Sequence, residues 1–254
     1  MPKDANGLNV SLLDASAMAS RENGGRSHPY SSVSAHAYGV QDEAICNLIE
    51  AGDHIVGVVA EARAGVGGEE VATGWVMSSM IIPGATVPPS TAQLIGTTVQ
   101  GYLAVVLEHT LVGHETTPTQ AMSAIRTVHG AVVVRELEPS TGVDDEIAAN
   151  LSITNVQLGV QGLPPNGIDL MTEAVKIEGN GETLSRGVGG SLGSHPAEIL
   201  VSAANIFARR NQSLDGGWVA LIGPLTPPVT YPLDATITAR FSTLGEAQIP
   251  RPRR

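Results

Sequence analysis

The stretch TTVQGYLAVVLEHTL, residues 97–111, determines the fold that this chain can adopt. Its residues alternate between two sets, which is the pattern of a strand buried on both faces. Leu103 and Val105 belong to one face, whereas Gln100 and Tyr102 belong to the other. The second face thus opens with an amide and a phenol, and if the sheet encloses a cavity these two side chains should point into it.

The composition indicates a folded protein with a large aliphatic core. The chain has 254 residues, of which 42% are hydrophobic but only 3% are aromatic, so Val, Ile, Leu and Ala must build the core. The formal net charge of −11 would repel a phosphate backbone, which argues against nucleic acid as a partner. A small molecule is the expected partner.

Redox chemistry and membrane insertion both lack support in the sequence. Cys46 is the single cysteine, which rules out a disulfide framework and a cysteine-based metal cluster. The first residues, MPKDANGLNV, have no apolar signal-peptide core, and no apolar run of about 18 residues follows. We therefore expect a cytoplasmic protein without a membrane partner.

Hydrophobic periodicity, together with turn-forming and helix-capping residues, predicts strands with a few helices between them. The segment 63–74 reads as a glycine-rich connection, and it lacks the GKS, GKT and GxGxxG patterns of nucleotide loops. Ser194 is placed to cap the last helix. Helices are predicted at 32–51, 117–130 and 194–211, and strands at 54–62, 75–82, 97–107, 131–138, 153–162, 169–179, 181–190, 218–231 and 235–249.

This order of elements favours a mixed α/β (α+β) fold built on rolled sheets. Residues 1–75 are predicted to form an N-terminal helical or extension region, and residues 76–254 the main domain, the two together making one compact unit.

Three segments carry a resemblance to a known family: AHAYGVQ (35–41), DEIAANLS (145–152) and LGSHPAEILVSAANIFARRNQSLDGGWVALIGPLTP (192–227). The chain resembles the 2-hydroxypentadienoate hydratase and 4-oxalocrotonate decarboxylase branch of the fumarylacetoacetate hydrolase superfamily, from about Ser32 to Ile249. The resemblance implies rolled mixed β-sheets with flanking helices, and a homo-oligomer.

The resemblance also implies a metal site from which this chain departs. The family binds Mg²⁺ or Mn²⁺ through three carboxylates, two of them alternate residues of one strand, and the metal stabilises the enolate of a 2-oxo acid. Gln100 and Tyr102 stand at the two strand positions and Val133 at the third, while the family's Lys and Asp fall on Val59 and Ala72. An amide, a phenol and an isopropyl group do not balance a 2+ charge, so we predict no metal and no other cofactor.

Charged residues beside the lost ligands are the next candidates. Glu61 and Arg63 lie just after Val59 and form either an acid/base pair or anion clamp, or a surface ion pair. Arg135 shares a strand face with Val133 and either holds a carboxylate or carbonyl, or is a solvated strand end.

Four further residues are candidate substrate contacts. Val59 and Val133 would line the vacated space. Trp75 lines an apolar cavity or belongs to the core, and His36 contacts substrate or is an ordinary helix residue.

The sequence thus favours a metal-independent, repurposed hydratase-like enzyme with Tyr102, Gln100, Arg63 and Glu61 as catalytic residues. It would cyclise, isomerise or hydrate an unsaturated carbonyl compound or a polyketide or polyene intermediate of bacterial secondary metabolism. Two alternatives stay open: a metal-dependent 2-oxo acid hydratase or decarboxylase of aromatic catabolism, and a non-catalytic partner subunit.

Overall fold

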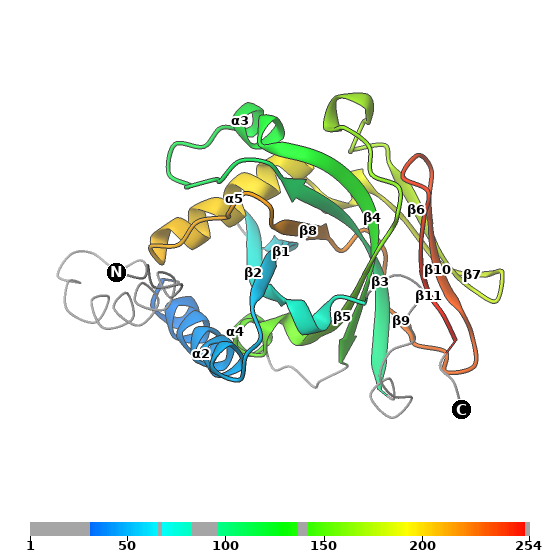
Figure 1. The fold of residues 1–254 in the computed structure, drawn as a ribbon, viewed down its shortest axis with the longest axis horizontal. Helices are drawn as coiled ribbons and strands as arrows, with labels where there is room; N and C mark the ends of the chain where they lie inside the picture. The colour runs from blue at the N-terminus through cyan, green and yellow to red at the C-terminus, as the bar shows by residue number, and fades with distance from the viewer. Residues whose placement is uncertain (1–30, 66–67, 83–95, 137–141, 252–254) are drawn as a thin grey trace, which may run out of the picture.

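The computed structural model describes residues 31–65, 68–82, 96–136 and 142–251 (Figure 1). The first 30 residues of the predicted N-terminal region 1–75 lie outside the described residues. None of the helices described combines the length and apolar character needed to cross a bilayer.

Helix α2 opens the described chain and spans Ser31–Glu50, within one residue of the prediction at each end. It ends where Gly52 takes a left-handed backbone with φ of 97°, and the N–H of Gly52 donates to the carbonyl of Ile49 at 2.9 Å.

The larger sheet curls around the middle of the molecule, as Figure 1 shows. Its order is β2-β1-β8-β3-β4-β5, with β9 paired to β3, and only β1 and β8 run parallel to each other. Its strands are β1 (Ile55–Gly65), β2 (Gly68–Met77), β3 (Thr97–Leu107), β4 (Ile125–Glu136), β5 (Ile153–Leu158), β8 (Val219–Gly223) and β9 (Val229–Thr230).

A second sheet, ordered β11-β10-β6-β7, packs through β10 and β11 against β4. Its strands are β6 (Ala174–Gly179), β7 (Glu182–Val188), β10 (Ile237–Phe241) and β11 (Glu246–Ile249), and the remaining α-helices are α3 (Pro118–Ser123), α4 (Val143–Ala148) and α5 (Pro196–Arg209). The mixed α+β fold with rolled sheets is therefore confirmed.

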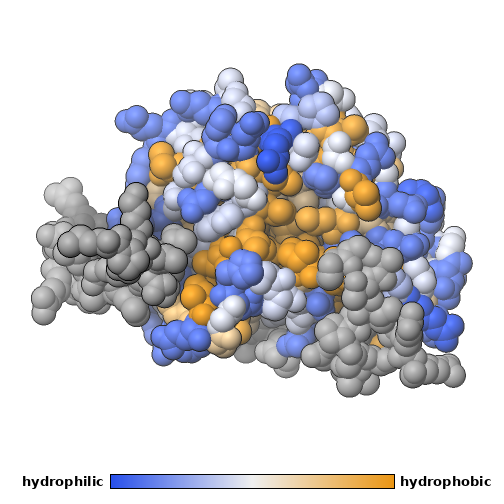
Figure 2. Space-filling model, in the orientation of Figure 1, coloured by the Kyte–Doolittle hydropathy of each residue, from blue (hydrophilic) through white to orange (hydrophobic). Residues whose placement is uncertain are grey.

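The strand β3 has two buried faces, as the alternation predicted. Leu103 and Val105 join a core cluster that also contains Phe207 of α5. Tyr102 joins a separate cluster that contains Ile147 of α4. We call the face of the sheet that carries Tyr102 the inner face. Figure 2 shows apolar residues gathered in the middle of the viewed face and polar residues around them.

Within the described part of the chain, side chains and not a further strand cover the outer edge of β2 at Thr73 and Trp75. The N–H of Thr73 donates to Tyr38 Oη at 3.1 Å, and Gln41 Nε2 donates to the Thr73 carbonyl at 3.0 Å. The Asn150 amide accepts from the N–H of Trp75 at 2.7 Å and donates to its carbonyl at 2.9 Å. These bonds satisfy backbone groups that a sheet edge otherwise leaves unpaired. Two of the segments that carry the family resemblance, residues 35–41 and 145–152, therefore supply the side chains that cover this edge.

Three boundary predictions were wrong. The helix predicted at 117–130 ends at Ser123, because from Ile125 onward the chain pairs with β3, which places His129 inside β4. The glycine-rich connection is instead a hairpin of β1 and β2, broken only between Gly65 and Gly68.

The strand predicted at 75–82 was also too long, because residues 78–80 form a 3₁₀ turn. Helix α5 is capped by His195 and not by Ser194, since His195 Nδ1 accepts from the N–H of Ala197 at 3.1 Å. Strands β5 to β11 lie within the predicted strand segments, whereas helix α4 lies outside the predicted helices.

We expect Gly57→Ala to destabilise the fold by about 2–4 kcal/mol, because the added Cβ would lie 2.0 Å from the Val219 carbonyl oxygen on β8. The matched control is Gly39→Ala in helix α2, where nothing lies within 4 Å, and it should stabilise by about 0.5–1 kcal/mol. Urea unfolding of both variants measures the two changes, and equal effects would contradict the close approach of β1 to β8.

Candidate functional site

Four of the predicted site residues lie together on the inner face of the large sheet. Glu61 and Arg63 come from β1, Tyr102 from β3 and Arg135 from β4. Because their spacing is even within each strand, alternation places them on the same face as the inner apolar cluster. We call these four residues the Glu61 cluster.

Strand β8 lies between β1 and β3, and Gly223 on it lets Glu61 and Tyr102 meet. Gly223 is the register partner of Glu61. A Cβ at Gly223 would lie 2.3 Å from Tyr102 Cδ1. Only a residue without a side chain therefore lets the Tyr102 ring lie across β8 towards Glu61.

The Glu61 carboxylate accepts hydrogen bonds from all three other members. Tyr102 Oη donates to Oε1 at 2.7 Å, and Arg135 Nη1 donates to Oε1 and Oε2 at 3.0 and 3.2 Å. Arg63 Nη2 donates to Oε2 at 3.1 Å. Charge-assisted bonds of this kind compensate a carboxylate for the loss of water.

Two further groups hold the arginines from outside the cluster. Arg63 forms an ion pair with Glu146 of α4, and Arg135 Nε donates to the Leu151 carbonyl at 2.8 Å. The two guanidinium charges are thus balanced by the carboxylates of Glu61 and Glu146. Sequence reasoning missed Glu146, Leu151 and Gly223, and no spacing signal linked them to Glu61.

Burial divides the cluster into a closed part and an accessible part. Glu61 is 1% exposed and Tyr102 is fully buried, whereas the side chains of Arg63 and Arg135 are 22% and 15% exposed. Burial, reinforced by the negative charge of Glu61, raises the pKa of Tyr102 well above its usual value, so its phenol stays protonated. A ligand reaching the cluster would meet the two guanidinium groups first.

The other inner-face candidates form an apolar wall beside Tyr102. Val59 and Val133 are fully buried in the same cluster, and Val133 is the register partner of Gln100. Gln100 is 5% exposed, and its Nε2 donates to the Thr226 carbonyl at 3.1 Å. Both β3 side chains expected to point into the enclosed space therefore have their donors bonded within the protein.

The structure does not bring Trp75 or His36 to Glu61. Trp75 belongs to the other core cluster, packs edge-on against Phe207 with ring centroids 4.7 Å apart, and donates from Nε1 to Asp42 at 3.1 Å. The guanidinium group of Arg210 lies over the Trp75 ring, 5.6 Å from its centroid. His36 is exposed on α2.

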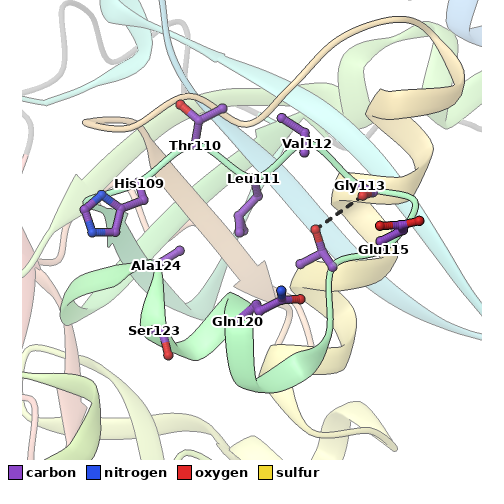
Figure 3. A pocket seen from close by; sticks show the side chains of 10 residues that line it. His109, Thr110, Leu111, Val112, Gly113, Glu115, Gln120, Ser123 and Ala124 are labelled. Atoms are coloured by element: carbon purple, nitrogen blue, oxygen red, sulfur yellow. Dashed lines mark hydrogen bonds between the residues drawn. The ribbon is translucent and has the colours of Figure 1, made fainter.

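A hollow of about 380 Å³ lies elsewhere, between the chain that follows β3 and helix α3 (Figure 3). None of the predicted site residues lines it. The polar side chains around it include His109, Glu115 and Gln120, and Thr116 Oγ1 donates to the Gly113 carbonyl at 3.4 Å.

No family model matches the sequence. The chain is 27% identical to a 4-oxalocrotonate decarboxylase of Pseudomonas putida over 219 residues, 83% of either protein. It is 28% identical to a 2-hydroxyhexa-2,4-dienoate hydratase of Comamonas testosteroni over 149 residues, which cover 58% of this chain and 56% of the hydratase.

Solved structures confirm the expected fold. The structure of 4-oxalocrotonate decarboxylase from Pseudomonas putida G7, complexed with calcium and acetate, matches with a TM-score of 0.79 over 95% of this chain and 93% of that one, at 23% identity. A 5-carboxymethyl-2-hydroxymuconate delta-isomerase from Mycobacterium smegmatis matches with a TM-score of 0.60 over 79% of this chain and 80% of that one, at 17% identity.

The residues at the expected metal position do not fit a divalent cation. Gln100, Tyr102 and Val133 supply no carboxylate, and each carboxylate oxygen of Glu61 already accepts two hydrogen bonds from Tyr102, Arg63 or Arg135. Within the described ranges, no three His, Cys, Asp or Glu residues gather as a metal-binding group.

We expect Glu61→Gln to destabilise the protein by about 2–4 kcal/mol, because it leaves Arg135 without its carboxylate partner. The control is Glu246→Gln, whose pair with Arg240 is about half exposed on both sides, and it should cost less than about 1 kcal/mol. Urea unfolding near pH 7 measures both. Equal losses would show that the Glu61 bonds are no stronger than surface ion pairs.

Tyr102 is expected not to ionise in the folded protein between about pH 9 and pH 11. Replacing it by Phe should leave the phenolate absorbance curve of the protein unchanged over this range. Because the unfolded chain ionises Tyr102 near pH 10 and the folded chain does not, this group makes folding less favourable as the pH rises above about 10. Loss of a phenolate signal with a midpoint near pH 10 in Tyr102→Phe would contradict the burial of Tyr102.

Proposed function

Because this chain belongs to the hydratase and decarboxylase branch of the fumarylacetoacetate hydrolase superfamily, we propose that it is a hydratase-like enzyme that works without a metal. The observation that carries the proposal is the Glu61 cluster. Two guanidinium cations lie on the inner face of the sheet, where the predicted ligand positions of the family hold uncharged groups.

In this proposal Arg63 and Arg135 bind the substrate. Their side chains are the partly exposed members of the cluster, and a guanidinium group donates to carbonyl and carboxylate oxygens. An oxygen that gains negative charge during the reaction would be stabilised by these fixed donors. In the family that the chain resembles, a divalent cation stabilises the negative charge on this oxygen.

Glu61 and Tyr102 keep the two guanidinium groups in place. The carboxylate bonds to both arginines, and the neutral phenol of Tyr102 fixes Oε1 at 2.7 Å. For Tyr102 or Gln100 to donate to a substrate directly, the substrate must replace the bonds that these residues make to Glu61 and to the Thr226 carbonyl.

The proposed substrate is an unsaturated carbonyl compound, such as a polyketide or polyene intermediate of bacterial secondary metabolism. Cyclisation, isomerisation and addition of water all place charge on a carbonyl oxygen in such a compound. The apolar wall of Val59 and Val133 would hold a flexible chain in a reactive conformation, which alone can contribute several orders of magnitude in effective molarity.

One observation favours a second candidate, the non-catalytic partner subunit: Tyr102 is fully buried, and its donor and that of Gln100 are bonded within the protein. The metal-dependent alternative has less support. It would need carboxylates near the predicted ligand positions to take over as ligands. Glu108 and Glu136 are exposed, and Glu138 lies outside the described residues.

The proposal is tested with purified protein that has been treated with EDTA. A panel of α,β-unsaturated carbonyl compounds, including 2-keto-4-pentenoate and 4-oxalocrotonate, is followed by loss of conjugated absorbance and by mass spectrometry. We expect turnover that survives EDTA and that Mg²⁺ does not increase. Arg135→Met should lower kcat by about 10²–10³-fold, whereas Arg240→Met, on the outer surface of the second sheet, should leave it unchanged.

Other outcomes identify the alternatives. Turnover that requires Mg²⁺ or Mn²⁺ would establish the metal-dependent enzyme. A chain that turns over nothing alone, but forms a stable complex with a second, active chain, would establish the partner subunit. Either result would overturn the proposal.

A further inference from the structure

Three consecutive residues after helix α4 have a left-handed backbone, although none of them is glycine. The φ angles of Asn150, Leu151 and Ser152 are 52°, 57° and 53°. This conformation costs an L-residue about 1–2 kcal/mol, and it usually occurs at single residues. We call residues 150–152 the left-handed turn. Its surroundings must supply the energy that keeps it in this form.

Two sets of contacts hold the left-handed turn against strand β2. The Asn150 amide makes its two hydrogen bonds with the backbone of Trp75, and the Leu151 side chain is fully buried. A Cβ on Gly74 would lie 2.9 Å from Asn150 Oδ1 and 3.3 Å from Leu151 Cδ1. The turn therefore docks onto β2 at a position where the strand has no side chain.

The left-handed turn also reaches the Glu61 cluster. Its Leu151 carbonyl accepts from Arg135 Nε at 2.8 Å, while Nη1 of the same guanidinium group binds both oxygens of Glu61. A planar guanidinium group held at Nε and Nη1 has its plane and direction fixed. On the β3 side the backbone of Arg135 pairs regularly with Thr98, whereas on the β5 side the register shifts between Val134 and Arg135. Strand pairing places the backbone of Arg135 but does not set the plane of its guanidinium group.

We propose that the left-handed turn sets the orientation of the Arg135 guanidinium group, with Asn150 as the positioning residue. Asn150 touches neither Arg135 nor Glu61 in the hydrogen bonds described; it acts through the turn and the Leu151 carbonyl. The consequence for catalysis rests on the function proposed above, whereas the consequence for the geometry of Arg135 does not.

The test compares three variants with the wild-type protein. Asn150→Ala removes both bonds to Trp75. Asn150→Asp keeps an acceptor for the Trp75 N–H and a residue type that tolerates positive φ, but it loses the donor. Ser152→Gly is the matched control, because it relieves strain in the same turn and keeps both Asn150 bonds.

The first measurement is the exchange of the Arg135 Nε–H with water, followed by ¹⁵N NMR and assigned through the loss of its signal in Arg135→Lys. We expect at least tenfold faster exchange in Asn150→Ala, an intermediate rate in Asn150→Asp, and the wild-type rate in Ser152→Gly. A role confined to stability would lower the unfolding midpoint of the Asn150 variants but leave this exchange rate unchanged.

The second measurement is kcat for whichever compound of the panel is converted. We expect Asn150→Asp to lower kcat about tenfold or more with KM changed less than twofold, and Ser152→Gly to change neither. If Asn150→Ala does not fold, Asn150→Asp decides both measurements. Wild-type exchange at Arg135 in a folded Asn150 variant would overturn the proposal. Faster exchange in a protein that converts no compound would instead support the positioning and refute the proposed function.

Discussion

A single buried carboxylate, that of Glu61, organises the inner face of this protein. A carboxylate that is 1% exposed has lost its water and requires donors in its place. Three side chains supply them, from three strands that are not all neighbours in the sheet. Three other features help to bring these donors to one point. Gly223 leaves room for the Tyr102 ring, Glu146 pairs with Arg63, and the Leu151 carbonyl accepts a hydrogen bond from Arg135.

This chain has the fold of its solved relatives, and the resemblance predicts that it differs from them at the metal site. The overall match to a 4-oxalocrotonate decarboxylase is high, with a TM-score of 0.79, while the identity is 23%. At the positions where the resemblance predicts the family's three carboxylates, this chain has an amide, a phenol and an isopropyl group. Close to them lie the guanidinium groups of Arg63 and Arg135, whose charges are balanced by Glu61 and Glu146.

Much of this arrangement could be predicted from the sequence, because strand alternation fixes faces without knowledge of the fold. The period of two in β3 placed Tyr102 opposite to Leu103, and the same rule placed Arg135 on the face of Val133. Trp75 shows the limit of this reasoning: its position after a glycine did not reveal that it packs on α5 through Phe207. Glu146 could not be linked to Arg63 because an ion pair between a helix and a distant strand leaves no periodic signal. Nor does any local propensity favour three left-handed residues in a row, and the bonds of Asn150 to Trp75 and of Leu151 to Arg135 join residues far apart in the sequence.

The capped edge of strand β2 restricts how copies of this protein can associate. At Thr73 and Trp75 the outward backbone groups already bond to Tyr38, Gln41 and Asn150. Another chain cannot add a strand there without first displacing these three side chains, two of which, Gln41 and Asn150, are buried. Assembly by continuation of the large sheet is therefore blocked along this part of β2, and so is aggregation by the same route. Any oligomer of the chain has to be built from side-chain surfaces or from other strand edges.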